Sequence, residues 1–231
     1  MHPATAASLG TTLEKIDMKC ATLVLAIAGT ALLGSCANPE RSRDLANPAV
    51  SATTIALQVC SDCHGFTGNA VSPNFPNLAA QTPAYLAAQL RGFKSHDRQD
   101  PEGFEYMWGI SRSLTDAQID GLASYYANQQ PVRQPIEGEA SRMPAGKNIF
   151  EAGLPAQNVP ACSACHGNQG QGNDAFPRIA GQHVDYIVKQ MIVFQRTDER
   201  PAGAVMKAVV HELSADDIAN VAAYAQALTA K

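Results

Sequence analysis

Two copies of the motif Cys-x-x-Cys-His constrain this chain more than any other feature. They begin at Cys60 and Cys162, 102 residues apart. Residues after the motifs recur at nearly the same offset: Pro76, Gln81, Tyr85, Gln89 and Phe93 return as Pro177, Gln182, Tyr186, Gln190 and Phe194, and Met107, Leu114, Ile119 and Tyr125 return as Met206, Leu213, Ile218 and Tyr224. Such self-similarity indicates a duplicated structural unit. The chain is therefore predicted to contain two homologous domains.

Each unit favours helices, and neither shows a convincing alternating strand pattern. Thr82 and Pro83 offer an N-cap and a proline at the first helical position. The final helices open with Thr115 followed by Gln118, a capping box, and with Ser214 followed by Asp217, which is only similar to one. Each unit then has the order motif, proline loop, helix, loop with methionine, helix. We expect an all-α fold.

The domain boundaries follow from the repeat and from breaks in composition. Segment 131–144 contains three prolines and no apolar periodicity, which is typical of a linker. We predict a signal segment at 1–37, a leader at 38–47, a first domain at 48–130, a linker at 131–144 and a second domain at 145–231.

The N-terminal segment predicts export. An apolar run from Ala21 to Leu33 is too short to span a bilayer but fits a signal sequence, and Met18 just before it is a candidate initiator. Two cleavage modes stay open at its end. Leu33-Gly34-Ser35-Cys36 resembles a lipobox, in which Cys36 is lipidated, whereas Ser35-Cys36-Ala37 suits ordinary cleavage. We expect a periplasmic protein, with a lipid anchor to the membrane as one alternative.

The motif itself is the attachment signal for c-type haem. Its two thiols add to the haem vinyl groups, and the histidine binds the iron. Cys60, Cys63, Cys162 and Cys165 are thus predicted to attach two covalently bound haem c groups. Three other interpretations are a zinc site, a thioredoxin-like dithiol and a structural disulfide. They are weaker because the two pairs lie far apart, no strand and helix context surrounds them, and a disulfide leaves His64 and His166 unexplained.

The sixth iron ligand decides whether such a haem carries electrons or binds substrates. Met107 lies 43 residues after His64, and Met206 lies 40 residues after His166. We predict axial pairs of His64 with Met107 and His166 with Met206. Met191 corresponds to Leu90 on an apolar helix face and is assigned to core packing. Three further histidines without a repeat partner, His96, His183 and His211, are expected at the surface.

Two more pairs of residues are candidates for supporting the haems. The carbonyls of Pro76 and Pro177 are placed to accept a hydrogen bond from the free nitrogen of each iron-bound imidazole, which would fix the ring. Arg98 and Arg200 occupy similar repeat positions. They have two interpretations, as partners of haem propionates or as solvated loop arginines.

These motifs resemble the class I cytochromes c, and specifically the dihaem cytochrome c4 family, from about residue 48 to 228. The resemblance rests on Pro-Asn-Leu-Ala-Ala-Gln with Tyr-Leu-Ala-Ala-Gln-Leu in the first unit, and on Pro-Arg-Ile-Ala-Gly-Gln with Tyr-Ile-Val-Lys-Gln-Met in the second. It implies two tandem class I cytochrome c domains related by pseudo-twofold symmetry. It also implies electron transfer between redox partner proteins, such as a quinol-oxidising complex and a terminal oxidase.

Composition excludes some functions and leaves others. With a net charge of -4 and 17 scattered Lys and Arg residues, the chain has no basic patch for nucleic acid. Acidic residues outnumber basic ones by 7 to 4 in 48–130, which favours a basic partner there. The alternatives to a carrier are an enzyme with one open haem, of the dihaem peroxidase or thiosulfate-oxidising type, and a haem subunit docked to a membrane complex.

Overall fold

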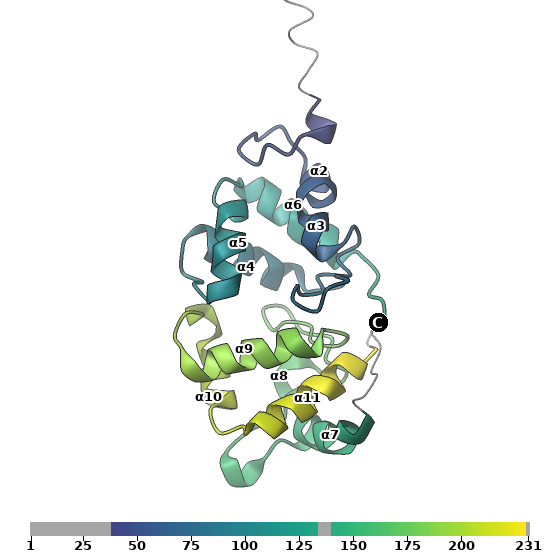
Figure 1. Cartoon of the computed structure of the whole chain (residues 1–231), viewed down its shortest axis with the longest axis vertical. Helices are drawn as coiled ribbons and strands as arrows, with labels where there is room; N and C mark the ends of the chain where they lie inside the picture. Colours follow the sequence, from purple (N-terminus) through teal and green to yellow (C-terminus); the bar gives the residue numbers. More distant parts are fainter. Residues whose placement is uncertain (1–37, 134–139, 230–231) are drawn as a thin grey trace, which may run out of the picture. The chain divides into compact units, whose positions relative to one another are not determined.

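The computed structural model describes residues 38–133 and 140–229. The predicted signal segment with Cys36, and residues 134–139 of the predicted linker, lie outside the described residues. From Pro39 onward the chain forms one compact unit. Figure 1 colours its first half, up to residue 133, from purple to teal, and its second half, from residue 140, from green to yellow.

The regular elements among the described residues are helices, with two isolated bridges and no strand. The all-α prediction is therefore confirmed. None of the described helices is both long enough and apolar enough to cross a membrane. The elements of the first half are η2 (Pro39–Arg41), α2 (Ala52–Ile55), the π-helical turn η3 (Ala56–Cys60), α3 (Ser61–His64), α4 (Pro83–Lys94), α5 (Pro101–Ser111) and α6 (Asp116–Ala127).

The second half repeats this order with one additional 3-10 turn. Its elements are η4 (Ala140–Arg142), α7 (Met143–Ala152), η5 (Pro155–Gln157), α8 (Ser163–His166), α9 (Val184–Arg196), η6 (Pro201–Gly203), α10 (Ala204–Val210) and α11 (Ala215–Ala227). Helix α7 takes the place of α2 against the final helix, and η6 is the additional turn before α10. Helix α7 begins at Met143, so the last two residues assigned to the linker are already helical.

The helix starts follow the predicted caps. The side chain of Thr82 accepts a hydrogen bond from the Tyr85 amide, and Pro83 stands at the first helical position of α4. Thr115 and Gln118 close a full capping box on α6. Ser214 and Asp217 close one as well, because the Asp217 carboxylate accepts from the Ser214 amide at 3.1 Å. The second box is therefore complete and not merely similar.

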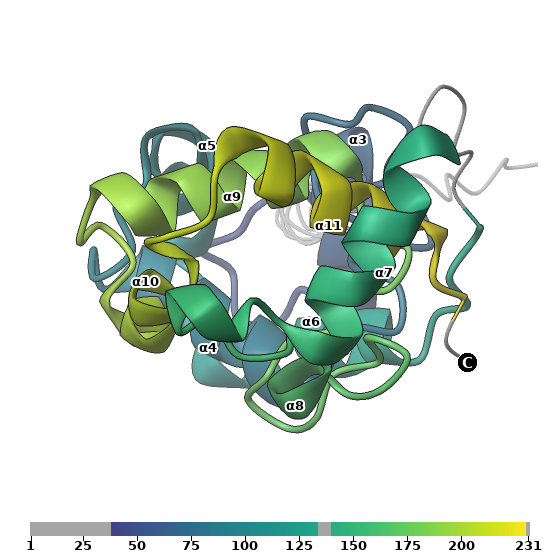
Figure 2. The ribbon, with the colours of Figure 1, turned by 90° about the horizontal axis from the view of Figure 1, so that it is seen from below.

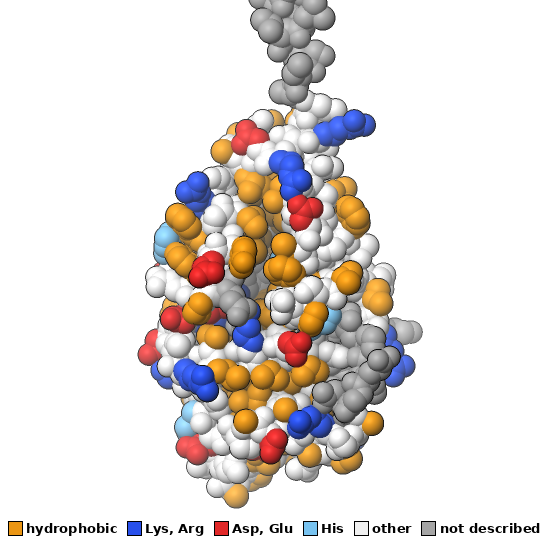
Figure 3. Space-filling view, viewed as in Figure 1, with side chains coloured by type: hydrophobic (Ala, Val, Ile, Leu, Met, Phe, Trp, Pro, Cys, Tyr) orange, Lys and Arg blue, Asp and Glu red, His pale blue; other side chains and the backbone are white. Residues whose placement is uncertain are grey.

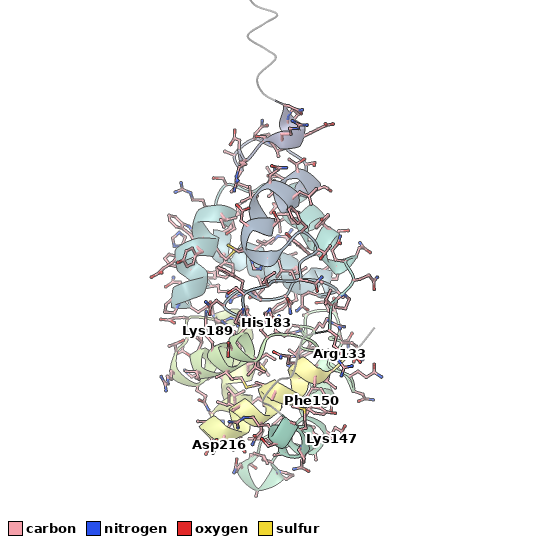
Figure 4. The ribbon with its side chains drawn as sticks, turned by 45° about the vertical axis from the view of Figure 1, so that its right-hand side comes forward. Arg133, Lys147, Phe150, His183, Lys189 and Asp216 are labelled. Carbon is pink, nitrogen blue, oxygen red and sulfur yellow. The ribbon has the colours of Figure 1, made fainter. Side chains whose placement is uncertain are left out.

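Each half has its own hydrophobic core. The first core is built on Ile55, Leu114, Ile119 and Leu122, and the second on Ile149, Phe150, Ile218 and Val221. In the second half α7 packs across α11 (Figure 2). Phe150 on α7, labelled in Figure 4, lies against Tyr224 on α11 with ring centroids 5.4 Å apart and the ring planes tilted by 55°. Two separate cores match the duplicated sequence.

The two halves meet through reciprocal hydrogen bonds. The side chain of Gln81 binds the backbone of Arg178, and the side chain of Gln182 binds the backbone of Asn77. Gln81 corresponds to Gln182 in the repeat, and Asn77 corresponds to Arg178, both at an offset of 101 residues. The pattern is the one that a local twofold axis between the halves produces.

Candidate metal centres

The first motif folds into a single helical stretch. Cys60 is the last residue of η3, and Cys63 and His64 follow in α3, so the turn gathers two thiols and one imidazole. Gly65 ends the helix with a φ of 73°, and a side chain there would run into the backbone carbonyl of Asn69. This glycine lets the chain turn away directly after the imidazole.

The second motif has the same local structure. Cys162 is the N-cap of α8, which contains Cys165 and His166. Gly167 then adopts a φ of 84°. The two motifs differ at one position only, Asp62 against Ala164, and form the same turn.

Both motif histidines are buried and held by a proline carbonyl, as predicted. Nδ1 of His64 lies 2.9 Å from the carbonyl oxygen of Pro76, and Nδ1 of His166 lies 2.8 Å from that of Pro177. A carbonyl only accepts, so Nδ1 carries the proton and Nε2 keeps its lone pair for a metal. Burial lowers the pKa of both imidazoles, against the opposing effect of the carbonyl bond. Both rings are therefore favoured in the neutral state that a metal binds.

The first cysteine of each motif is held as a protonated thiol. Burial raises the pKa of Cys60 and of Cys162 to about 11. None of the four motif cysteines forms a disulfide. In the part of the chain that the structure describes, no three His, Cys, Asp or Glu side chains gather as a metal site. The four thiols are thus not arranged as zinc ligands, which need to converge on one point.

The candidate methionines lie on helices, although the sequence analysis placed them in loops. Met107 is in α5 and Met206 in α10, and both are half-buried. Helix α5 begins with Pro101 at its first position, where a missing amide proton costs nothing. Met206 packs against the second core. Met191 is 8% exposed within that same core, which confirms its assignment to packing.

One prediction about the other histidines was wrong. His96 and His211 are exposed, as expected, but His183 is buried at the start of α9. Its Nε2 lies 3.0 Å from the carbonyl oxygen of Ala70 in the first half (Figure 4). Nothing in the sequence indicates this contact, because it depends on how the two halves pack together.

The two repeat arginines are also buried, which excludes their interpretation as solvated loop residues. Arg98 binds Asp100 in its own half, while Arg200 binds Tyr85 of the other half. Each guanidinium also lies over a phenylalanine of its own half, Phe93 or Phe194, at 4.3 and 4.6 Å from the ring centre. Both therefore belong to the contact between the halves.

Sequence reasoning missed three polar residues of this contact. Gln81 and Gln182 recur in the repeat, but nothing in the sequence indicates that each reaches the opposite half. Asp100, 1% exposed, is the acidic partner of Arg98. An acidic residue two positions after a repeated arginine was the only available signal.

The site residues fit a covalently attached haem. In each half, two thiols and a neutral imidazole with a free nitrogen lie on one short turn, which matches the donor set of c-type attachment. Figure 3 shows hydrophobic side chains gathered around a hollow in the face of the first half, between α3 and α5. A large apolar ring system suits such surroundings. The second half repeats the turn and the histidine bond.

Comparison with known proteins agrees with this geometry. The profile of the cytochrome c family matches residues 50–130 and 144–229. Cytochrome c4 from Azotobacter vinelandii is 34% identical over 179 residues, covering 74% of this chain and 84% of that protein. The structure of cytochrome c4 from Acidithiobacillus ferrooxidans aligns with a TM-score of 0.68 at 37% identity, covering 73% of this chain and 98% of that one. A thiosulfate dehydrogenase electron acceptor from Thiomonas intermedia is 33% identical over 135 residues, covering 57% of this chain and 60% of that protein.

Proposed function

The chain belongs to the cytochrome c family, as a dihaem electron carrier of the cytochrome c4 type, and we propose that His64 with Met107 and His166 with Met206 hold its two irons. Cys60 and Cys63 attach the first haem, and Cys162 and Cys165 attach the second. The observation that carries the histidine assignment is the bond from each motif histidine to a proline carbonyl, found twice at 2.9 and 2.8 Å. The methionines are proposed from their corresponding positions in the repeat.

The protein residues act by holding the iron surroundings constant. When bound, each haem supplies a reversible one-electron change at its iron. The buried histidine is fixed in one tautomer and one ring orientation by its carbonyl partner. A thioether from Met107 or Met206 would be the second protein ligand of each iron and would exclude small molecules. A closed, rigid site of this kind transfers electrons without making bonds in a substrate.

The correspondence of the two methionine segments favours a carrier over an enzyme. A dihaem peroxidase or a thiosulfate-oxidising cytochrome needs one haem with an open or altered sixth position. The two methionine segments of this chain correspond in the repeat, and both are helical and half-buried. This equivalence supports two closed haems and a role as carrier.

We further propose that the protein works in the periplasm. Its partners would be redox proteins such as a quinol-oxidising complex and a terminal oxidase, and lipidation of Cys36 would tie it to the membrane. The acidic excess of residues 48–130 favours a basic partner at the first half. A rate of reduction by such a partner that falls as salt is added supports this orientation, and a rate that does not change with salt contradicts it.

The test of the ligand assignment is spectroscopic. Ferric protein carrying two haems should show the weak sulfur-to-iron absorption band at the intensity of two methionine-bound irons. Reduced protein should bind no carbon monoxide at either haem. Ready binding of carbon monoxide to one haem would instead favour the enzyme.

A further inference from the structure

One peptide group in the first half lies between the motif histidine and a glutamine of the second half. The carbonyl of Pro76 accepts the hydrogen bond from His64 Nδ1. The amide of the same peptide belongs to Asn77, and it donates to Oε1 of Gln182 at 2.8 Å. Nε2 of Gln182 also donates to the Asn77 carbonyl at 3.0 Å. The side chain of Gln182 thereby binds both the amide and the carbonyl of Asn77.

The second half contains the equivalent arrangement, with Gln81 of the first half as the glutamine. The carbonyl of Pro177 accepts from His166, and the amide of the same peptide, on Arg178, donates to Oε1 of Gln81 at 2.7 Å. Nε2 of Gln81 donates to the Arg178 carbonyl at 2.9 Å. Gln81 and Gln182 are 5% and 6% exposed, so water has little access to either chain of bonds. A cavity of about 10 Å³ beside them has room for a single water molecule.

When the N–H and the carbonyl of one peptide group are both hydrogen-bonded, each bond changes the polarity of the other group. An acceptor at its N–H makes its carbonyl oxygen more negative, and successive hydrogen bonds strengthen one another in a buried, weakly polar setting. A more negative carbonyl draws more strongly on the Nδ1 proton of the histidine. This raises the basicity of the ring nitrogen that faces the metal.

We propose that each half tunes the haem of the other through this chain of bonds, with Gln182 acting on His64 and Gln81 acting on His166. The inference rests on the proposed function, because it takes these histidines as iron ligands. A more basic ligand stabilises ferric iron and lowers the reduction potential. Loss of a glutamine bond should therefore raise the potential of the opposite haem. Gln81 and Gln182 are positioning residues that act through the histidines.

The experiment compares single variants of the complete haem-loaded protein. Gln182→Met keeps the length of the side chain but can neither accept from the Asn77 amide in the same way nor donate to its carbonyl. Gln81→Met does the same for the second haem. NMR-monitored redox titration follows each haem separately. We expect Gln182→Met to raise the potential of the first haem and Gln81→Met that of the second, with little change at the haem of the altered half.

Gln89→Met is the matched control. Gln89 lies at the same contact but binds Arg98 and Arg200, outside both chains of bonds. The proposal fails if a variant shifts the haem of its own half, or if all three variants shift both haems alike, since solvent entry at a loosened contact would do that. The Nδ1 proton of the affected histidine should also move upfield as its bond weakens, and an unchanged resonance contradicts the proposal.

A variant that fails to fold, and a failure of the proposed function itself, can both be distinguished from a failure of the tuning. If Gln182→Met does not fold, Gln182→Asn keeps an amide that is too short to reach both atoms, and the same direction of shift is expected. If the unaltered protein lacks two covalent haems or the spectrum of histidine and methionine ligation, the proposed function fails. Intact ligation without the crossed shifts overturns only the tuning.

Discussion

Arg98 and Asp100 form an ion pair buried where the two halves meet. Nε of Arg98 lies 2.6 Å from Oδ1 of Asp100, Nη2 donates to Oδ2 at 3.1 Å, and the side chains are 9% and 1% exposed. Gln89 links this pair to the second half, because its Oε1 accepts from Arg98 at 2.7 Å and from Arg200 at 3.0 Å. Gln190 of the second half donates to Asp100 at 3.3 Å. The carboxylate of Asp100 thus accepts hydrogen bonds from both halves.

Substitution Asp100→Asn should strongly destabilise the protein. It removes the negative charge and leaves the guanidinium of Arg98 buried without its counter-charge. Removing one partner of a buried ion pair costs about 3–5 kcal/mol. Denaturant unfolding of the haem-loaded protein measures the loss. Asp120→Asn is the control, because Asp120 pairs with Arg91 at the surface at 2.7 Å. The two variants unfolding at the same denaturant concentration would contradict the role of the buried pair.

His183 should make stability depend on pH. Burial lowers its pKa from the ordinary value of 6.5, against the opposing effects of the Ala70 carbonyl and the Asp185 charge. The folded state therefore favours neutral His183, so its contribution is complete above pH 6.5 and is lost as the pH falls, because the unfolded chain takes up the proton first. The motif histidines do not compete in this range while iron holds them.

The corresponding residue of the first half, Thr82, supplies the test. His183→Thr should show a smaller fall in melting temperature between about pH 7.5 and pH 5. At neutral pH its stability should change little. Loss of the Ala70 bond costs about 0.5–1.5 kcal/mol, and threonine restores an N-cap side chain worth a similar amount. His211→Thr, at an exposed position, should keep the original slope. An unchanged slope in His183→Thr would show that another group titrates.

The methionine assignment can be tested one haem at a time. Met107→Leu should open the first haem, so that half of the sulfur-to-iron absorption disappears and one equivalent of carbon monoxide binds after reduction. Met206→Leu should do the same for the second haem. Met191→Leu removes a methionine from the second core and should change neither property. Carbon monoxide binding that is the same in Met107→Leu and in Met191→Leu would remove Met107 as a ligand.

The local structure around the haem sites could be predicted because single residues determine it. Thr82 and Pro83 define the start of α4 wherever the rest of the chain lies. The bond from His64 to Pro76 follows from a motif and a proline loop that recur together. The repeat also placed Met191 in the core of the second half, where it is 8% exposed. These inferences need only contacts within one half.

Other features could not be predicted because they depend on packing. Helix α5 contains a proline and two glycines, which favour a loop, yet Trp108 stacks on Phe104 with centroids 5.8 Å apart and the segment packs against α4. Such tertiary contacts override weak helix propensity. The burial of His183 could not be predicted either, because its partner Ala70 lies 113 residues away in the other half.

The close crossing of α7 over α11 makes a last prediction about two helical glycines. At Gly146 of α7, a β-carbon would run into the backbone carbonyl of Asn220 and lie 2.8 Å from Cβ of Tyr224. Gly146→Ala must therefore push the helices apart and weaken the contact of Phe150 with the second core. At Gly109 of α5, a β-carbon would meet nothing within 4 Å, so Gly109→Ala should stabilise the protein by about 0.5–1 kcal/mol through helix propensity alone. Thermal unfolding of both variants should show opposite signs, and a stabilised Gly146→Ala would mean that the two helices do not cross at that residue.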